Sequence, residues 1–239
     1  MDIPTKKHRK ILITQALPYA NASLHLGHIL EAVQTDIWSR YQNLNGNECY
    51  FFCADDTHGT PVMLKAKELN ISPEELIKNI YKDHIKTYEK YNVLFTNFYS
   101  THSDENKNYS EFIYEKAKSK NLITREKIEQ LYDDKEKMFL SDRFIKGSCP
   151  KCDAEDQFGD NCGKCGASYD VLDIKNPIST ISNTSPIKKQ SEHIFFNLEK
   201  QKDILENFLD KANLQDPVKN KLKEWLDDDL KKWEISRDE

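Results

Sequence analysis

The sequence predicts an α/β protein in which a parallel sheet is followed by a cysteine-rich insertion. Short apolar runs alternate with helical patterns over the first 121 residues, and this order is typical of a parallel sheet. From residue 122 to about residue 186 the alternation gives way to short, turn-rich segments, and these contain two CxxC pairs. We therefore expect three parts, at 1–121, 122–198 and 199–239.

The first predicted strand is Ile11–Thr14, a short apolar run that ends before a turn at Pro18. Apolar side chains then recur at intervals of three and four from Gly27 to about Asn45, which predicts a helix. A second apolar run, Cys49–Ala54, predicts a buried strand beside the first.

The remaining elements follow from capping and turn signals. Pro61 is typical of the first position of a helix. The segment 72–75 (Ser-Pro-Glu-Glu) reads as a capping box that opens a helix reaching about Tyr91. Further along, we expect a strand at 98–101, a helix from 103 to about 121, a strand at 191–198 and helices at 199–212 and 217–232.

Composition and charge narrow the class of protein. The 239 residues carry a formal net charge of -5, whereas a protein that holds nucleic acid by bulk charge is usually basic. Nucleic acid could therefore bind only through a local patch. The apolar runs are far shorter than the roughly 18 residues that span a bilayer, and no N-terminal signal sequence is found. We expect a cytoplasmic protein with no membrane partner.

Four cysteines have the spacing of a metal site. Cys149 and Cys152 form one CxxC pair, and Cys162 and Cys165 form a second after nine intervening residues. Four thiolates suit one tetrahedral Zn²⁺, and a closed shell of four leaves no position for water, so a structural zinc is expected. Two disulfides or a redox pair are the alternatives, but neither a secretory context nor a thioredoxin-like pattern supports them. Neighbouring glycines would allow the positive φ that such turns often need: Gly147, Gly163 and Gly166.

Two histidines stand where the first strand meets its helix. His25 and His28 are three residues apart and so share one face of the helix start, with Gly27 between them. Ligands of α/β sheets bind beyond the carboxyl ends of strands, and a helix N-terminus there suits phosphate. Two imidazoles at this place could stabilise charge on a phosphoryl group under attack. Satisfied surface or core histidines, or metal ligands, are the other interpretations of the spacing alone.

Two carboxylates follow the second predicted strand. Asp55 and Asp56 stand at its carboxyl end, beside the first loop, where they could hold a substrate ammonium group. Loop solvation and helix capping by Thr60 are the alternative interpretation.

Five segments taken together resemble the methionyl-tRNA synthetases, a family of class I aminoacyl-tRNA synthetases. His25-Leu-Gly-His28 is similar to the HIGH signature of that class, and the whole combination resembles the bacterial long form with a four-cysteine connective insertion. The segments are LPYANASLHLGH (17–28), CADDTHGTP (53–61), the four cysteines, SEHIFFNL (191–198) and WEISRD (233–238).

The resemblance implies a fold and a reaction. The fold would be a Rossmann-like (HUP-type) nucleotide-binding half-domain with an inserted zinc-binding connective domain. The reaction would join L-methionine to ATP, with Mg²⁺, as methionyl-adenylate, and then transfer methionine to tRNA(Met). It further implies roles for single residues: His25, Gly27 and His28 at the ATP phosphates; Leu17, Tyr19 and Asp56 at methionine; and Arg237 as a third catalytic residue beside His25 and His28.

The resemblance also implies that the sequence is the N-terminal portion of such an enzyme. The KMSKS loop and the anticodon-binding domain of the family have no counterpart in the 239 residues, so we expect these residues alone to charge tRNA poorly. Two other functions stay open at this point. One is another HxGH nucleotidyltransferase or class I synthetase, and the other is a non-enzymatic zinc-ribbon module that binds nucleic acid.

Overall fold

The structure is a computed structural model, and it describes residues 8–227 and 230–236. The chain divides into two compact units, residues 1–113 and 114–239. The boundary falls inside helix α4 (Asp104–Ser119), which carries the chain from one unit into the other. The three-part division at residues 121 and 198 stays a prediction.

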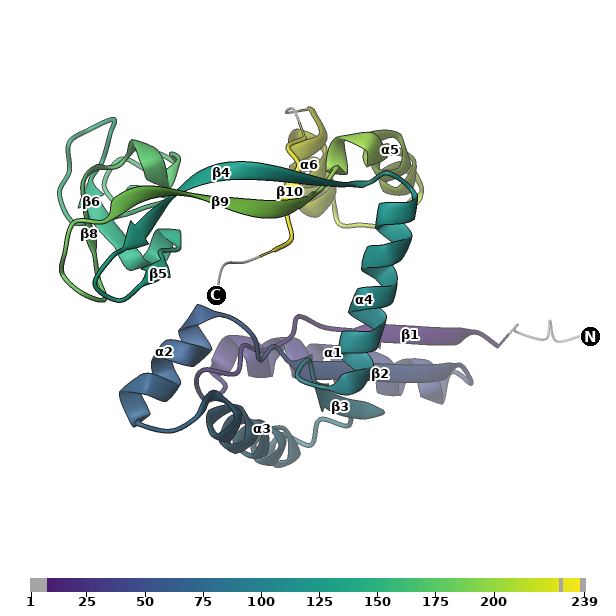
Figure 1. Cartoon of the computed structure of the whole chain (residues 1–239). Coiled ribbons are helices and arrows are strands. Elements are labelled where there is room, and N and C mark those ends of the chain that lie inside the picture. Colours follow the sequence, from purple (N-terminus) through teal and green to yellow (C-terminus); the bar gives the residue numbers. More distant parts are fainter. Residues whose placement is uncertain (1–7, 228–229, 237–239) are drawn as a thin grey trace, which may run out of the picture. The chain divides into compact units, whose positions relative to one another are not determined.

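The first unit is built on a parallel sheet with the strand order β1-β2-β3 (Figure 1). Its strands are β1 (Lys10–Thr14), β2 (Glu48–Asp55) and β3 (Asn97–Ser100). The parallel sheet predicted from the alternating pattern is confirmed. Because all three strands run the same way, their carboxyl ends share one edge of the sheet, where ligand loops of α/β proteins lie.

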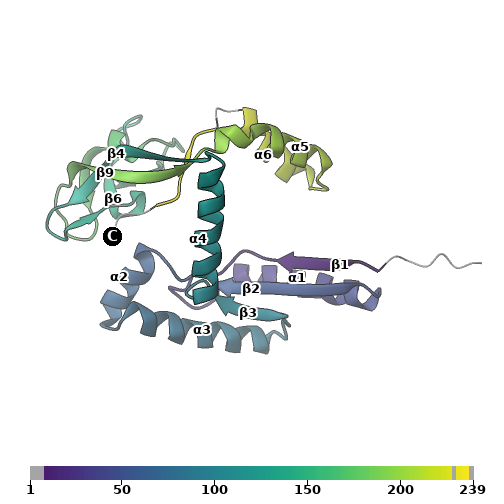
Figure 2. The same ribbon diagram turned by 45° about the vertical axis from the view of Figure 1, so that its right-hand side comes forward.

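Helices connect and cover these strands. They are α1 (Leu26–Leu44), α2 (Thr60–Leu69) and α3 (Pro73–Lys90), and Figure 2 shows them around the sheet in a second view. One core cluster joins Ile13 of β1, Phe51 of β2, Ile29 of α1 and Tyr88 of α3. Burying a side chain such as that of Phe51 stabilises the fold by roughly 1.5–3 kcal/mol.

Helix α3 begins where the sequence places it. The Ser72 hydroxyl accepts a hydrogen bond from the Glu75 amide at 3.1 Å, and Pro73 is the first helical residue. Proline fits there because the first amides of a helix have no intrahelical partner. The start of α3 is thus fixed by local sequence, and α3 packs against α2 through a second apolar cluster around Val62 and Leu76.

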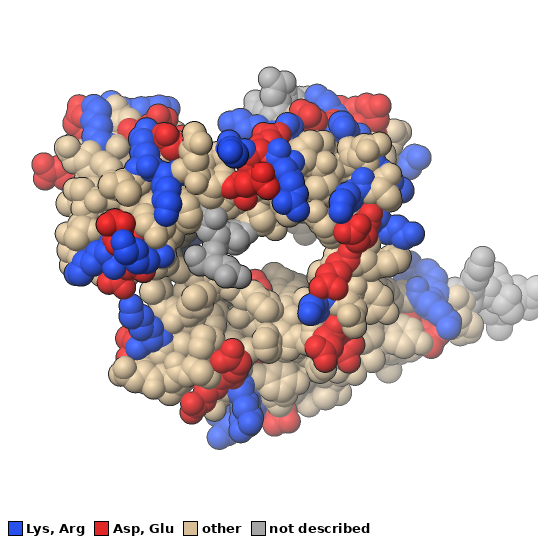
Figure 3. Space-filling view, in the orientation of Figure 1, with Lys and Arg blue, Asp and Glu red and all other residues tan. Residues whose placement is uncertain are grey.

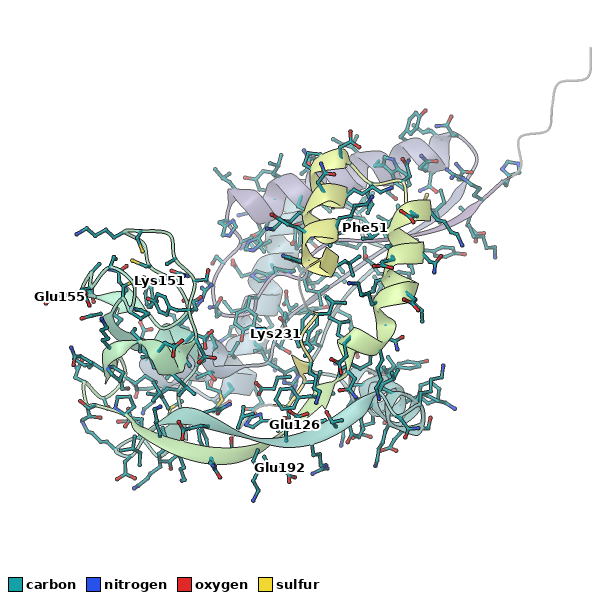
Figure 4. The ribbon with its side chains drawn as sticks, turned by 90° about the horizontal axis from the view of Figure 1, so that it is seen from above. Phe51, Glu126, Lys151, Glu155, Glu192 and Lys231 are labelled. Atoms are coloured by element: carbon teal, nitrogen blue, oxygen red, sulfur yellow. The ribbon has the colours of Figure 1, made fainter. Side chains whose placement is uncertain are left out.

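The second unit contains a long antiparallel ribbon that the sequence did not reveal. β4 (Ile123–Asp133) pairs with β9 (Ile187–Phe196) over ten residue pairs, from Ile123↔Phe196 to Tyr132↔Ile187. Figure 4 shows Glu126 and Glu192 on this twisted ribbon. The prediction of only short, irregular segments after residue 122 was therefore wrong for β4. Its apolar residues do not alternate regularly, and its partner strand lies far away in the chain.

Smaller elements complete the second unit. A three-stranded sheet has the order β7-β6-β8, and β9 carries β10 on its other edge. The predicted helix 217–232 is too long, because α6 ends at Asp227 and residues 233–234 form β10, which the sequence analysis did not foresee. The predicted helix 199–212 begins as a 3₁₀ turn. The elements are β5 (Met138–Phe139), η1 (Asp142–Phe144), β6 (Ile145–Ser148), β7 (Gln157–Phe158), η2 (Val171–Asp173), β8 (Lys175–Ser179), η3 (Leu198–Gln201), α5 (Lys202–Lys211), α6 (Asp216–Asp227) and β10 (Trp233–Glu234).

Charged side chains of both signs are interspersed over the visible face of each unit (Figure 3). Several form ion pairs, such as Arg125–Glu192 across the ribbon at 3.0 Å. Among the described helices, none combines the length and the apolar character that crossing a membrane requires.

Candidate functional site

The loop after β1 is joined to the end of β2. The Asp56 amide donates to the Pro18 carbonyl at 2.9 Å, and the Ala20 amide donates to the Asp56 carbonyl at 2.8 Å. These bonds continue the parallel pairing of β1 and β2 beyond the strands themselves. They place Tyr19 directly opposite Asp56, so two of the residues predicted to bind methionine lie side by side. Leu17, the third, is 43% exposed on the same loop.

His25 and His28 cap the start of α1. The Nδ1 atom of His25 accepts a hydrogen bond from the Gly27 amide at 3.1 Å, and the Nδ1 atom of His28 accepts one from the His25 amide at 3.2 Å. Since each Nδ1 accepts, the ring proton of each neutral imidazole must be on Nε2. The helix start therefore presents two Nε2–H donors, together with its own amide dipoles.

Gly27 is required by this arrangement. A Cβ atom at Gly27 would lie 2.9 Å from the Cε1 atom of His25, closer than such contacts occur. Burial, followed by the neighbouring His25, lowers the pKa of His28 below its ordinary value. His28 is thus kept as the neutral ring that its capping hydrogen bond needs.

Tyr19 is held over the loop that follows β2. Its hydroxyl donates to the His58 carbonyl, and burial together with the charge of Asp56 raises the pKa of the phenol. Gly59 has a φ of +116°, and a Cβ atom there would lie 2.4 Å from the Tyr19 hydroxyl. A glycine at this position is what allows the ring of Tyr19 to approach the loop.

The two adjacent aspartates have different surroundings. Asp55 is fully buried, and its carboxylate is bound to the ring of His84. Asp56 is half-buried. Within residues 8–227 and 230–236, the structure shows no hydrogen bond or ion pair to the Asp56 carboxylate. Of the two carboxylates, Asp56 is therefore the one available to a ligand cation.

The third predicted catalytic residue, Arg237, lies outside the described residues. The segment before it is held to the ribbon, where the Ile194 amide donates to the Ser236 hydroxyl at 2.8 Å and the Ile235 amide to the Ile194 carbonyl at 2.9 Å.

The four cysteines of the second unit converge. Their sulfur atoms all lie within 4.8 Å of one another, with 3.9 Å between Cys149 and Cys165 and 3.7 Å between Cys152 and Cys162. Sulfur atoms about 2.3 Å from a tetrahedral Zn²⁺ are about 3.8 Å apart, whereas a disulfide bond is about 2.05 Å. The four cysteines can hold a metal ion, and their geometry is not that of disulfides.

Both CxxC pairs adopt the same turn. The Asp153 amide donates to the Cys149 carbonyl at 3.0 Å, and the Gly166 amide donates to the Cys162 carbonyl at 2.9 Å. Figure 4 labels Lys151 of the first turn and Glu155, which follows that turn in the chain. Of the three glycines expected to supply positive φ, only Gly166 does so, at +71°, and Asp153 takes that role in the first turn at +57°.

The sequence analysis missed several residues that shape the first site. Gly59 and Glu31 are two of them, and the Glu31 carboxylate accepts the Ala16 amide at 2.7 Å. The third is His84 of α3. Gly59 lies inside a segment already singled out, so its position could have been noticed, but Glu31 and His84 meet the site only through tertiary packing.

A family model described as tRNA synthetases class I (M) matches residues 11–239. Among solved structures, the chain is similar to Mycobacterium tuberculosis methionyl-tRNA synthetase in complex with methionyl-adenylate, with a TM-score of 0.70 and 18% identity over 97% of this chain. It is also similar to LeuRS of Agrobacterium radiobacter K84 in a ternary complex with tRNA and LeuAMS. That match has a TM-score of 0.64 and 17% identity, and it covers 93% of this chain and 26% of the other. The chain spans 41% of the mycobacterial protein.

Proposed function

The chain belongs to the family of class I tRNA synthetases (M), and from this premise we propose that it is the ATP-binding catalytic portion of a methionine–tRNA ligase. The activity would proceed in two steps. A carboxylate oxygen of methionine attacks the α-phosphorus of ATP, the bond to the β-phosphate oxygen breaks, and pyrophosphate leaves. A ribose hydroxyl of tRNA(Met) then attacks the methionyl carbonyl carbon, and AMP leaves.

The observation that carries this proposal is the pair of Nε2–H donors at the start of α1. His25 and His28 use their Nδ1 atoms for backbone caps, so their other ring nitrogens are oriented before any ligand arrives. Donors that are already oriented stabilise the charge that develops on a phosphoryl group without a reorganisation cost, and removing one such donor typically costs about 10²–10³ in rate. The close backbone approach at Gly27 suits a phosphate chain at the same place.

The loop opposite supplies a fitting site for methionine. The available Asp56 carboxylate would bind the α-ammonium group, and the Tyr19 ring beside it would pack on the thioether, a favourable sulfur–aromatic contact. Leu17, exposed on the same loop, would add an apolar wall. Arg237 would act on the anionic groups of the activated substrate.

The second unit would contribute the connective insertion. The sulfur distances support one structural Zn²⁺ held by Cys149, Cys152, Cys162 and Cys165. The zinc would stabilise the two turns, and ATP would bring its own Mg²⁺. We place this activity in the cytoplasm, where tRNA charging takes place.

Methionine-dependent ATP–pyrophosphate exchange by the full-length gene product tests the proposal. Exchange should occur with methionine alone in a panel of amino acids, and the His25→Ala and His28→Ala variants should each lose about 10²–10³ in rate. His8→Ala is the matched control, because His8 stands before the opposite end of β1. Exchange driven by another amino acid would move the protein to a neighbouring synthetase, and its absence with every amino acid would contradict the proposal.

A further inference from the structure

His84 is a fully buried histidine that contacts both loops of the site. It lies on α3, and its side chain has no exposed surface. Its Nδ1 atom is 2.7 Å from the Asp55 carboxylate, and its Nε2 atom is 2.9 Å from the Ala22 carbonyl. One imidazole therefore links the end of β2 to the loop after β1.

The hydrogen-bond partners fix where the protons are. A carbonyl oxygen only accepts, so Nε2 of His84 must donate to Ala22. A second proton lies between Nδ1 and the Asp55 carboxylate. Burial by itself lowers the pKa of His84, but the hydrogen bonds to Asp55 and Ala22 outweigh it and leave the pKa above its ordinary value. Each ring nitrogen of His84 thus shares a proton with an oxygen of a different segment, Nε2 with the Ala22 carbonyl and Nδ1 with the Asp55 carboxyl group.

Each of these two hydrogen bonds of His84, called here the Asp55 arm and the Ala22 arm, ends beside a residue with a proposed role in the reaction. Asp55 immediately precedes Asp56, and Ala22 lies three residues before His25. The other oxygen of the Asp55 carboxylate is buried and has no hydrogen-bond partner in the described part of the chain. The orientation of Asp55 thus depends on His84, and so does the position of the carbonyl at Ala22.

We propose that His84 is a positioning residue that holds the loop bearing His25 in register with the strand end bearing Asp56. The inference rests on the proposed function for the roles of His25 and Asp56, and it adds a residue that touches neither substrate. The Ala22 arm orients the groups that act on ATP, while the Asp55 arm orients the group that binds the methionine ammonium.

Two variants separate the arms in the full-length gene product. In His84→Asn the side-chain amide nitrogen lies near the position of Nδ1, so the Asp55 bond is kept and the Ala22 bond is lost. In His84→Gln the amide nitrogen lies near Nε2, so the Ala22 bond is kept and the Asp55 bond is lost. His84→Asn should lower kcat of pyrophosphate exchange by about 100-fold with a smaller change in the methionine KM, since small misplacements of reacting groups have effects of that size. His84→Gln should raise the methionine KM by about 10-fold, with kcat within about 3-fold, because the weakened group is a binding group.

Val93→Ala is the matched control, because Val93 is buried in the core cluster of the same unit and lies outside the two segments that His84 joins, residues 20–27 and 55–58. If both His84 variants lower the melting temperature as this control does and leave kcat and KM at its values, His84 has only a structural role and the proposal is wrong. If His84→Gln is insoluble because Asp55 is left as an unpaired buried charge, the double variant His84→Gln/Asp55→Asn replaces it and should show the same rise in KM.

Amide hydrogen exchange of the unliganded protein tests the positioning role without any activity. His84→Asn should speed exchange at residues 20–27 and not at 55–58. His84→Gln should speed exchange at residues 55–58 and not at 20–27. Equal protection of both segments in wild type and variants would overturn the inference. If wild type shows no methionine-dependent exchange of pyrophosphate, the proposed function fails, and this measurement still decides whether His84 holds the two segments.

Discussion

The imidazole rings of His25 and His28 are stacked, with centroids 3.7 Å apart and planes inclined by 18°. Each ring also caps a backbone amide through Nδ1. A proton added at either Nδ1 would break a cap and place a positive charge at the positive end of α1, beside another imidazole. The arrangement is therefore stable only while both rings are neutral.

We predict that His28 destabilises the protein in acid. The pKa of His28 is lowered in the folded protein by burial and by His25, so the unfolded chain, with a histidine pKa of about 6.5, takes up the proton first. The free energy of unfolding of wild type minus that of His28→Gln should be constant above about pH 7. It should fall as the pH drops below about 6.5 toward the lowered pKa. Urea unfolding at several pH values measures this. A difference that grows in acid would show that the folded state prefers the imidazolium.

We predict that Gly59→Ala weakens methionine binding as well as the fold. The new methyl group would lie 2.4 Å from the Tyr19 hydroxyl, at a φ of +116° that other residues rarely adopt. The expected destabilisation is about 1–3 kcal/mol, and the methionine KM should rise because Tyr19 must move. Gly163→Ala is the matched control, since a Cβ atom there meets its nearest neighbour at an ordinary 3.5 Å. An unchanged KM in a destabilised Gly59→Ala variant would mean that Tyr19 does not form the methionine pocket.

We predict one zinc ion per chain, coordinated by four sulfur atoms. X-ray absorption should give zinc–sulfur distances of about 2.3 Å without oxygen or nitrogen ligands. Cys152→Ser should lose most of the bound zinc and expose the turns at 149–168 to proteolysis, because structural zinc contributes directly to folding. Cys49→Ser, in β2 of the other unit, should keep one equivalent. Zinc retained in full by Cys152→Ser would contradict the four-cysteine site.

We predict that Asp133 anchors a turn in the second unit. Burial would raise the pKa of Asp133, but the neighbouring hydroxyl groups of Ser179 and Ser182 and two backbone amides lower it to about 2, so the carboxylate is charged at neutral pH. Its Oδ1 atom accepts the Lys135 and Glu136 amides at 3.0 Å each. Asp133→Ala should cost about 1–3 kcal/mol at pH 7, because the buried donors lose their partner.

The neighbouring exposed residue provides the control for that experiment. Asp134 forms a surface ion pair with Lys137, and such pairs contribute about 0–1 kcal/mol. Asp134→Ala should therefore leave the urea midpoint nearly unchanged. Equal destabilisation by the two variants would show that the turn is not held by the buried carboxylate.

Features fixed by short-range interactions could be predicted from the sequence. The strands around Ile13 and Phe51 are short apolar runs, and α3 begins at a Ser-Pro signal. The HxGH segment forms a helix start because its two imidazole rings accept hydrogen bonds from amides two and three residues away. In each CxxC turn, likewise, an amide of the turn itself donates to one of its sulfur atoms. In each case the partner atoms lie within a few residues, so the spacing of residue types is sufficient information.

The tertiary structure decided what depends on distant partners. β4 became a long strand because β9, more than fifty residues later, pairs with it. The local sequence does not distinguish Asp55 from Asp56, and only the resemblance to the methionyl-tRNA synthetases selected Asp56 as the methionine-binding residue. The buried ring of His84, brought in by the packing of α3, occupies Asp55, while the Asp56 carboxylate has no partner among the residues that the structure describes. Which side chains meet across the core depends on the folded tertiary structure. A buried polar contact contributes to stability only when folding has removed both partners from water.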